Sequence, residues 1–123
     1  MTRLPAAGST TSQEDEAITI RVSIQFFDGC PSWEVARTHL EEAARQLALD
    51  LDVETQRVDT LEAAERLGFI GSPTIRIAGK DPFAHPGAAP ALVCRLYATP
   101  EGLGGAPTTA QLVAVLAKQV QAT

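Results

Sequence analysis

The sequence predicts one α/β domain, in which a mixed sheet of four strands carries helices on both faces in the order β-α-β-α-β-β-α. Two observations predict this class: the folded part opens on strictly alternating apolar residues, and later segments repeat apolar residues at helical spacing. The chain has 123 residues, enough for one core and too few for two. We expect the domain to span residues 17–123 after a disordered tail, residues 1–16.

The first strand and the first helix have the clearest patterns. From Ile18 to Phe26 every second residue is apolar, which is typical of a strand with one buried face. An Asp-Gly pair ends this strand, and Pro31 suits the first turn of a helix because its missing N–H has no partner to lose there. The helical period continues to about Leu49.

The next three elements are shorter. Residues 51–58 are charged enough to form a protected edge strand. A second helix begins after Thr60, a good N-cap, and ends at Gly68, which tolerates the left-handed conformation of a helix end. The third strand is Ile75-Arg76-Ile77.

The last part of the chain predicts a fourth strand and a third helix. In residues 91–97 the alternation places Leu92, Cys94 and Leu96 on one buried face, and the short separation from the third strand predicts an antiparallel pair. The last helix begins at a capping box made by Thr108 and Gln111.

Composition excludes several classes of function. The formal net charge is −5 without any cluster of Lys or Arg, so we expect no nucleic-acid partner. No window is apolar enough to span a membrane, and we expect a cytoplasmic monomer. Two cysteines are too few for a disulfide framework or a cysteine zinc site, and neither His39 nor His85 has companions at ligand spacing, so we expect no metal centre.

Cys30 is the strongest candidate for chemistry. It follows the first strand and directly precedes Pro31, so its sulfur should lie near the unpaired N–H groups and positive end of the helix, which favour a thiolate. Its place on a turn also predicts exposure. Ser32 either caps the helix or bonds the sulfur, and Trp33 is either a core anchor or the wall of a substrate groove.

Two other segments carry candidate residues. Ser72-Pro73 precedes the third strand, where the proline is either an ordinary turn residue or a cis-proline. Cys94 is predicted to be a buried structural thiol, with the role of a distal partner for Cys30 as the alternative. Such a bridge needs Cα atoms within about 7 Å, and we expect a mid-strand position on the outer side of the sheet to fail this criterion.

The element order, Cys30 at the mouth of a helix and the Ser72-Pro73 segment together resemble the thioredoxin and glutaredoxin fold over residues 17–121. The resemblance implies that Ser72-Pro73 presents backbone to a substrate beside the active sulfur. Because Trp33 stands where the family has a resolving cysteine, it also implies a monothiol oxidoreductase acting on a protein disulfide or a small thiol. No cofactor is expected, except a low-molecular-weight thiol as co-substrate.

A closer resemblance is to small bacterial thioredoxin-like proteins, some of them labelled alkylmercury lyase. The segments that carry it are residues 27–33 (FDGCPSW), 71–74 (GSPT), 81–84 (DPFA), 94–97 (CRLY) and 106–108 (APT). It leaves two alternatives to the oxidoreductase: a non-catalytic binding module for a peptide, thiol ligand or soft metal, and the handling of mercury or organomercurials through Cys30 and Cys94.

Overall fold

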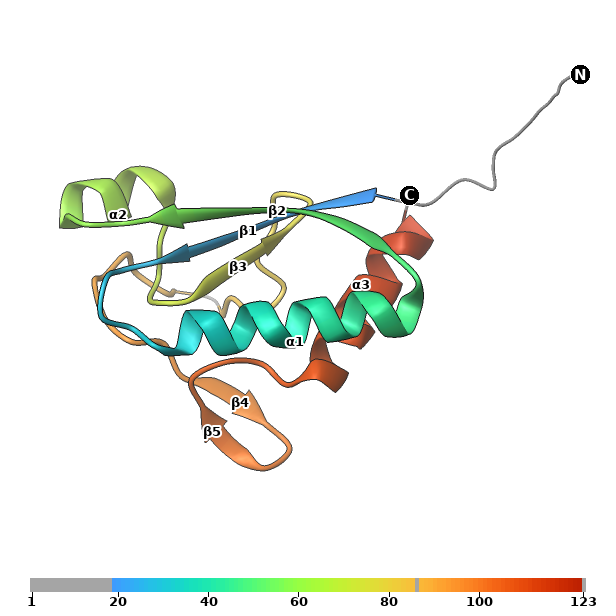
Figure 1. The fold of residues 1–123 in the computed structure, drawn as a ribbon. Helices are drawn as coiled ribbons and strands as arrows, with labels where there is room; N and C mark the ends of the chain where they lie inside the picture. The colour runs from blue at the N-terminus through green and yellow to red at the C-terminus, as the bar shows by residue number, and fades with distance from the viewer. Residues whose placement is uncertain (1–18, 86, 123) are drawn as a thin grey trace, which may run out of the picture.

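The fold is α/β with a small mixed sheet, as seen in the computed structural model, which describes residues 19–85 and 87–122 (Figure 1). The predicted tail, residues 1–16, lies outside the described residues. The elements are β1 (Thr19–Phe26), α1 (Ser32–Leu47), β2 (Asp50–Arg57), α2 (Leu61–Leu67), β3 (Thr74–Ile77), β4 (Tyr97–Thr99), β5 (Gly102–Gly104) and α3 (Thr109–Ala122).

The main sheet has the strand order β2-β1-β3. β1 runs parallel to β2 in a continuous register from Thr19 opposite Asp50 to Phe26 opposite Arg57. It runs antiparallel to β3, with Val22 opposite Ile77. The predicted edge position of β2 is therefore confirmed, and so is the parallel β-α-β start. The carboxyl end of β1 leads directly into the turn that carries Cys30.

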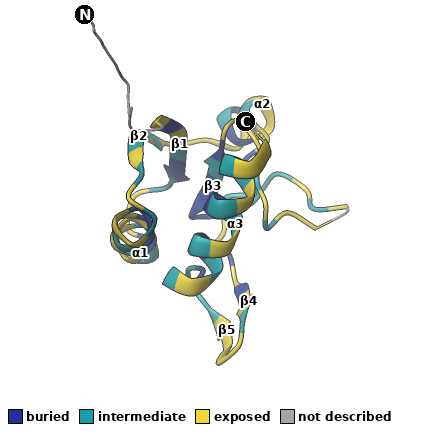
Figure 2. Cartoon of the chain, turned by 90° about the vertical axis from the view of Figure 1, so that its right-hand side faces the viewer, coloured by how far each residue is buried: buried dark blue, intermediate teal, exposed yellow. Residues whose placement is uncertain are grey.

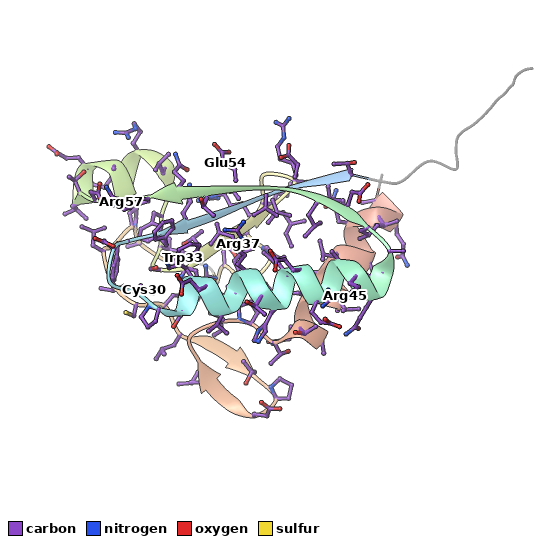
Figure 3. All side chains as sticks on the ribbon, viewed as in Figure 1. Cys30, Trp33, Arg37, Arg45, Glu54 and Arg57 are labelled. Carbon is purple, nitrogen blue, oxygen red and sulfur yellow. The ribbon has the colours of Figure 1, made fainter. Side chains whose placement is uncertain are left out.

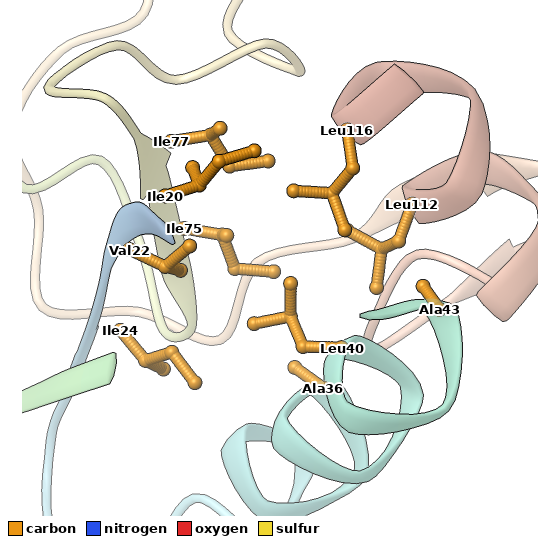
Figure 4. Packing of buried hydrophobic residues seen from close by; sticks show 10 residues of the cluster. All are labelled: Ile20, Val22, Ile24, Ala36, Leu40, Ala43, Ile75, Ile77, Leu112 and Leu116. Atoms are coloured by element: carbon orange, nitrogen blue, oxygen red, sulfur yellow. The ribbon is translucent and has the colours of Figure 1, made fainter. Parts of the chain in front are cut away.

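The core lies between one face of this sheet and helices α1 and α3 (Figures 2 and 4). The alternation in β1 aims its apolar side chains at this face, and β3, α1 and α3 supply the rest. The buried residues of the cluster are Ile20, Val22, Ile24, Ala36, Leu40, Ala43, Ile75, Ile77, Leu112 and Leu116. Burial at this level contributes about 1.5–3 kcal/mol per large side chain. It fixes α1, and with it the position of Cys30.

The opposite face of the sheet is more polar, and α2 lies on that side, at the end where β2 finishes (Figure 1). The Arg76 guanidinium on this face donates to the carbonyl oxygens of Leu67 and Gly68, both at 2.9 Å. Both ends of α2 are as predicted: Thr60 Oγ1 accepts from the Ala63 amide at 3.0 Å, and Gly68 adopts φ 69°.

The predicted fourth strand is wrong. The main sheet has three strands in the described residues, and segment 91–97 joins it only through one isolated parallel bridge between Ser72 and Cys94. The predicted buried face is also reversed, since Arg95 and Tyr97 are 8% and 4% exposed while Leu96 is 64% exposed. Specific polar contacts of Arg95 and Tyr97, described below, override the alternation of apolar residues.

The segment after this bridge forms a separate small hairpin. β4 pairs antiparallel with β5, where the sequence predicts a loop. The predicted capping box then starts α3: Thr108 Oγ1 accepts from the Gln111 amide at 3.1 Å, and Gln111 Oε1 accepts from the Thr108 amide at 2.9 Å. None of the helices in the described part of the chain combines the length and the apolar character needed to cross a bilayer.

Candidate functional site

Cys30 lies in the turn between β1 and α1, at the start of the helix (Figure 3). The Cys30 amide donates to the carbonyl oxygen of Phe27 at 3.3 Å, which closes the turn. Pro31, predicted as the first helical residue, occupies the N-cap position, and α1 begins one residue later at Ser32. The sulfur-bearing residue therefore stands next to the N-terminal end of α1, where the helix dipole favours negative charge.

The side chain of Cys30 is buried, with 2% exposure, and the prediction of exposure from its place on a turn is wrong. A shallow hollow of about 360 Å³ nevertheless reaches it. Its lining residues are Phe26, Asp28, Gly29, Cys30, Pro31, Trp33 and Glu34. Access to the sulfur is therefore restricted to small groups that enter this hollow.

Trp33 combines both interpretations offered by the sequence. Its ring stacks on Phe26, with centroids 4.3 Å apart and planes 17° from parallel, and packs against the edge of the core. It also lines the hollow beside Cys30. Neither interpretation of Ser32 is seen: the described residues contain no hydrogen bond from its hydroxyl to Cys30, and no side chain caps α1.

Ser72 meets Cys30 from the other side of the site. The Ser72-Pro73 bond is cis. The Cys30 thiol donates to the Ser72 carbonyl oxygen across 3.6 Å. That carbonyl also accepts from the Arg95 amide at 2.9 Å, and the Ser72 amide donates to the Val93 carbonyl at 2.8 Å. The Ser72 backbone groups that we expected to face a substrate are therefore already paired within the chain.

The backbone pairing of Ser72 with segment 93–95 places Cys94 opposite Ser72. Cys94 is exposed, not buried as predicted, and it forms the bridge to Ser72, whose carbonyl also contacts Cys30. Partial loss of hydration raises the pKa of the Cys94 thiol above its ordinary value, and charge repulsion from Cys30 raises it further.

A buried polar cluster that sequence reasoning missed holds segment 93–97 in place. The Arg95 guanidinium donates to the Asp81 carboxylate at 2.6 Å, and both side chains are nearly inaccessible, at 7% and 6% exposure. The guanidinium also lies 4.4 Å from the centre of the Tyr97 ring. The Tyr97 hydroxyl donates to the carbonyl oxygen of Pro73. Burial raises the pKa of Tyr97 far above its ordinary value, so this hydroxyl keeps its proton and continues to donate.

Two glycines allow the close approach of segments in this region. A Cβ on Gly71 would lie 3.0 Å from Arg95 Cβ, and Gly71 has φ 128°, a conformation that side chains resist. A Cβ on Gly105 would lie 3.0 Å from Ser32 Cβ, so the chain after the hairpin packs directly on the start of α1. The Gly-Ser-Pro-Thr motif in the sequence indicates a tight turn at Gly71. It does not indicate which segment of the chain packs against that glycine.

Removing the Cys30 sulfur is expected to make Cys94 easier to ionise. Charge repulsion from Cys30 raises the pKa of Cys94, so in Cys30→Ala this contribution vanishes and the pKa of Cys94 moves down towards its ordinary value. The measurement is the rate of Cys94 alkylation against pH, followed by mass spectrometry. Its midpoint should shift to lower pH in Cys30→Ala; an unchanged midpoint would show that the two sulfurs do not interact.

The described residues contain no group of three or more His, Cys, Asp or Glu side chains arranged to hold a metal ion. His39, expected to be solvated, is half-buried, and its Nδ1 lies 2.8 Å from the carbonyl oxygen of Pro107. The ring therefore joins α1 to the segment before α3. His85 is exposed, in the loop where we expected it.

No protein-family model, curated protein or solved structure matches the chain, so the resemblance to thioredoxin-like proteins stays a prediction from its residues.

Proposed function

We propose that this chain is a thiol–disulfide oxidoreductase in which Cys30 forms a mixed disulfide with the substrate. The observation that carries the proposal is the placement of Cys30 at the N-terminal end of α1, with its sulfur 3.6 Å from the Ser72 carbonyl oxygen. A thioredoxin-like fold belongs to the same proposal. The β-α-β start, the antiparallel β3 and the packing of α1 and α3 on one face of the sheet support it.

The first chemical step follows the monothiol scheme. The Cys30 thiolate attacks one sulfur of a substrate disulfide, a bond forms between that sulfur and Cys30, and the other substrate sulfur leaves as a thiolate. The attacking sulfur stands beside the N-terminal end of α1, where the helix dipole attracts negative charge. A low-molecular-weight thiol, which is oxidised in return, serves as the reductant of the cycle.

The burial of Cys30 favours a small disulfide as the substrate. The sulfur is reached through a hollow of about 360 Å³, at the lower end of the volumes typical of small-molecule sites. The Trp33 and Phe26 rings lie at this hollow and offer an apolar surface to the substrate. A disulfide of which one sulfur and its attached group enter this hollow is therefore the substrate class that we propose.

A second candidate function is favoured by the position of both cysteines beside Ser72. Two thiolates are good ligands for soft ions, so the pair would also suit a soft metal or an organomercurial. This binding activity needs no turnover. A chain that binds one equivalent of such an ion but does not accelerate thiol exchange would support this candidate over the oxidoreductase.

The proposed function is tested by the rate of thiol–disulfide exchange. The purified full chain is mixed with reduced glutathione and a small disulfide, and the oxidised glutathione formed is measured against the uncatalysed reaction. We expect acceleration by the wild type and the background rate for Cys30→Ser, with circular dichroism confirming that the variant folds. Background rates for both proteins, or full activity of Cys30→Ser, would contradict the proposal.

A further inference from the structure

Both thiol-bearing residues of the chain meet the backbone of Ser72. Cys94 forms a bridge to Ser72, and the carbonyl oxygen of that same Ser72 accepts from the Cys30 thiol. The two backbone hydrogen bonds on either side of Cys94, from Ser72 to Val93 and from Arg95 to Ser72, fix its backbone at this point. Both cysteines are free, and the chain has no others.

From this geometry we infer that Cys94 is the resolving cysteine of the site, and that the protein cycles between a Cys30, Cys94 dithiol and an internal Cys30–Cys94 disulfide. The inference rests on the proposed function, because it assigns the step after the mixed disulfide on Cys30. The absence of a Cys-x-x-Cys motif is then compensated by a cysteine 64 positions later in the sequence, brought in by the fold.

The resolving step needs no oxidant other than the substrate disulfide. The Cys94 thiolate attacks the Cys30 sulfur of the mixed disulfide, the Cys30–Cys94 bond forms, and the second half of the substrate leaves as a thiolate. The substrate disulfide gains two electrons and the two cysteines lose them. Two molecules of a low-molecular-weight thiol then restore the dithiol and leave as their own disulfide.

The different exposure of the two sulfurs determines which one the reductant attacks. Cys30 is buried, whereas Cys94 is exposed and its neighbours Val93 and Leu96 are 51% and 64% exposed. An incoming thiolate therefore meets Cys94. The Cys30 sulfur is then the leaving group of the exchange, beside the N-terminal end of α1, where negative charge is favoured. The exposed Cys94 sulfur therefore carries the second mixed disulfide.

The interaction between the sulfurs also orders the two steps. While Cys30 is free, it raises the pKa of Cys94, so Cys94 keeps its proton and Cys30 is the sulfur that attacks the substrate. Once Cys30 is in a mixed disulfide, its charge no longer repels a thiolate on Cys94. The pKa of Cys94 then falls, and its thiolate becomes available for the resolving attack.

The test treats the reduced full chain with oxidised glutathione, stops the reaction by alkylation and measures the intact mass and the modified peptides. We expect the wild type to lose two hydrogens and carry no glutathione, and Cys94→Ser and Cys94→Ala to accumulate glutathione on Cys30. Glutathione stable on Cys30 beside a free Cys94 in the wild type would overturn this inference and leave the proposed function standing. If neither sulfur reacts, the proposed function fails as well.

A second measurement tests the attack on Cys94. The oxidised chain is mixed with reduced glutathione and stopped by alkylation after a short time, and the two cysteine peptides are compared. We expect glutathione on Cys94 and the alkyl group on Cys30. The reverse pattern would overturn the assignment of Cys94 as the exposed sulfur of exchange. A disulfide between two chains in place of an internal one would overturn the pairing itself, and electrophoresis without reductant detects it.

Discussion

Replacing Asp81 with Ala is expected to reduce the free energy of unfolding by about 3–5 kcal/mol, because it leaves the Arg95 guanidinium buried without its counter-charge. Asp81 also accepts from the Phe83 amide at 2.9 Å, so the variant loses a second hydrogen bond. Since small domains have a total stability of roughly 5–15 kcal/mol, this is a large share of it. Urea unfolding at neutral pH measures the loss.

An exposed ion pair of the same chain provides the matched control. The Arg57 guanidinium lies 3.2 Å from the Asp59 carboxylate, but both side chains are more than half exposed. Asp59→Ala should therefore cost less than about 1 kcal/mol. Equal costs for Asp81→Ala and Asp59→Ala would contradict the structural role of the buried pair. If Asp81→Ala does not fold, Asp81→Asn gives the same comparison with a smaller change in side-chain volume.

Gly71→Ala is expected to separate the two sulfurs. Its Cβ would lie 3.0 Å from Arg95 Cβ and 3.4 Å from the Val93 carbonyl oxygen, so segment 93–95 must shift relative to Gly71 by a few tenths of an ångström. The positive φ adds roughly 1–3 kcal/mol of strain. We expect formation of the Cys30–Cys94 disulfide to slow by roughly tenfold or more, which corresponds to about 1.4 kcal/mol or more.

Gly79→Ala is the control variant that introduces backbone strain without displacing a neighbouring segment. Gly79 also has a positive φ, 85°, but no atom lies within 4 Å of the Cβ it would gain. The variant should lose stability without slowing disulfide formation. If Gly71→Ala and Gly79→Ala slow the reaction equally, the effect comes from strain in general, and the contact between Gly71 and Arg95 does not position Cys94.

The part of the fold that could be predicted from sequence depends on local patterns. The alternation in β1, the caps of α2 at Thr60 and Gly68, and the capping box at Thr108 are each encoded within a few residues. The structure confirms all three. The place of Cys30 at the start of α1 follows from the same local signals.

The position of Cys94 depends on contacts between distant residues, which no local pattern shows. The apolar Leu92 and Leu96 suggested that Cys94 faces the core, but a shift of one residue reverses the face of an extended segment. The Asp81 carboxylate pairs with Arg95, and the Pro73 carbonyl accepts from Tyr97, so these two polar side chains turn inward. Cys94 then turns outward beside Ser72.

The most direct test of the proposed site asks whether the two sulfurs lie together in solution. Phenylarsine oxide binds pairs of neighbouring thiols and needs no redox change. Titration of the reduced full chain, followed by intact mass, should show one bound arsenical in the wild type and none that survives dilution in Cys30→Ser or Cys94→Ser. Equal retention by the wild type and either variant, or no binding at all, would contradict the convergence of Cys30 and Cys94 on one site.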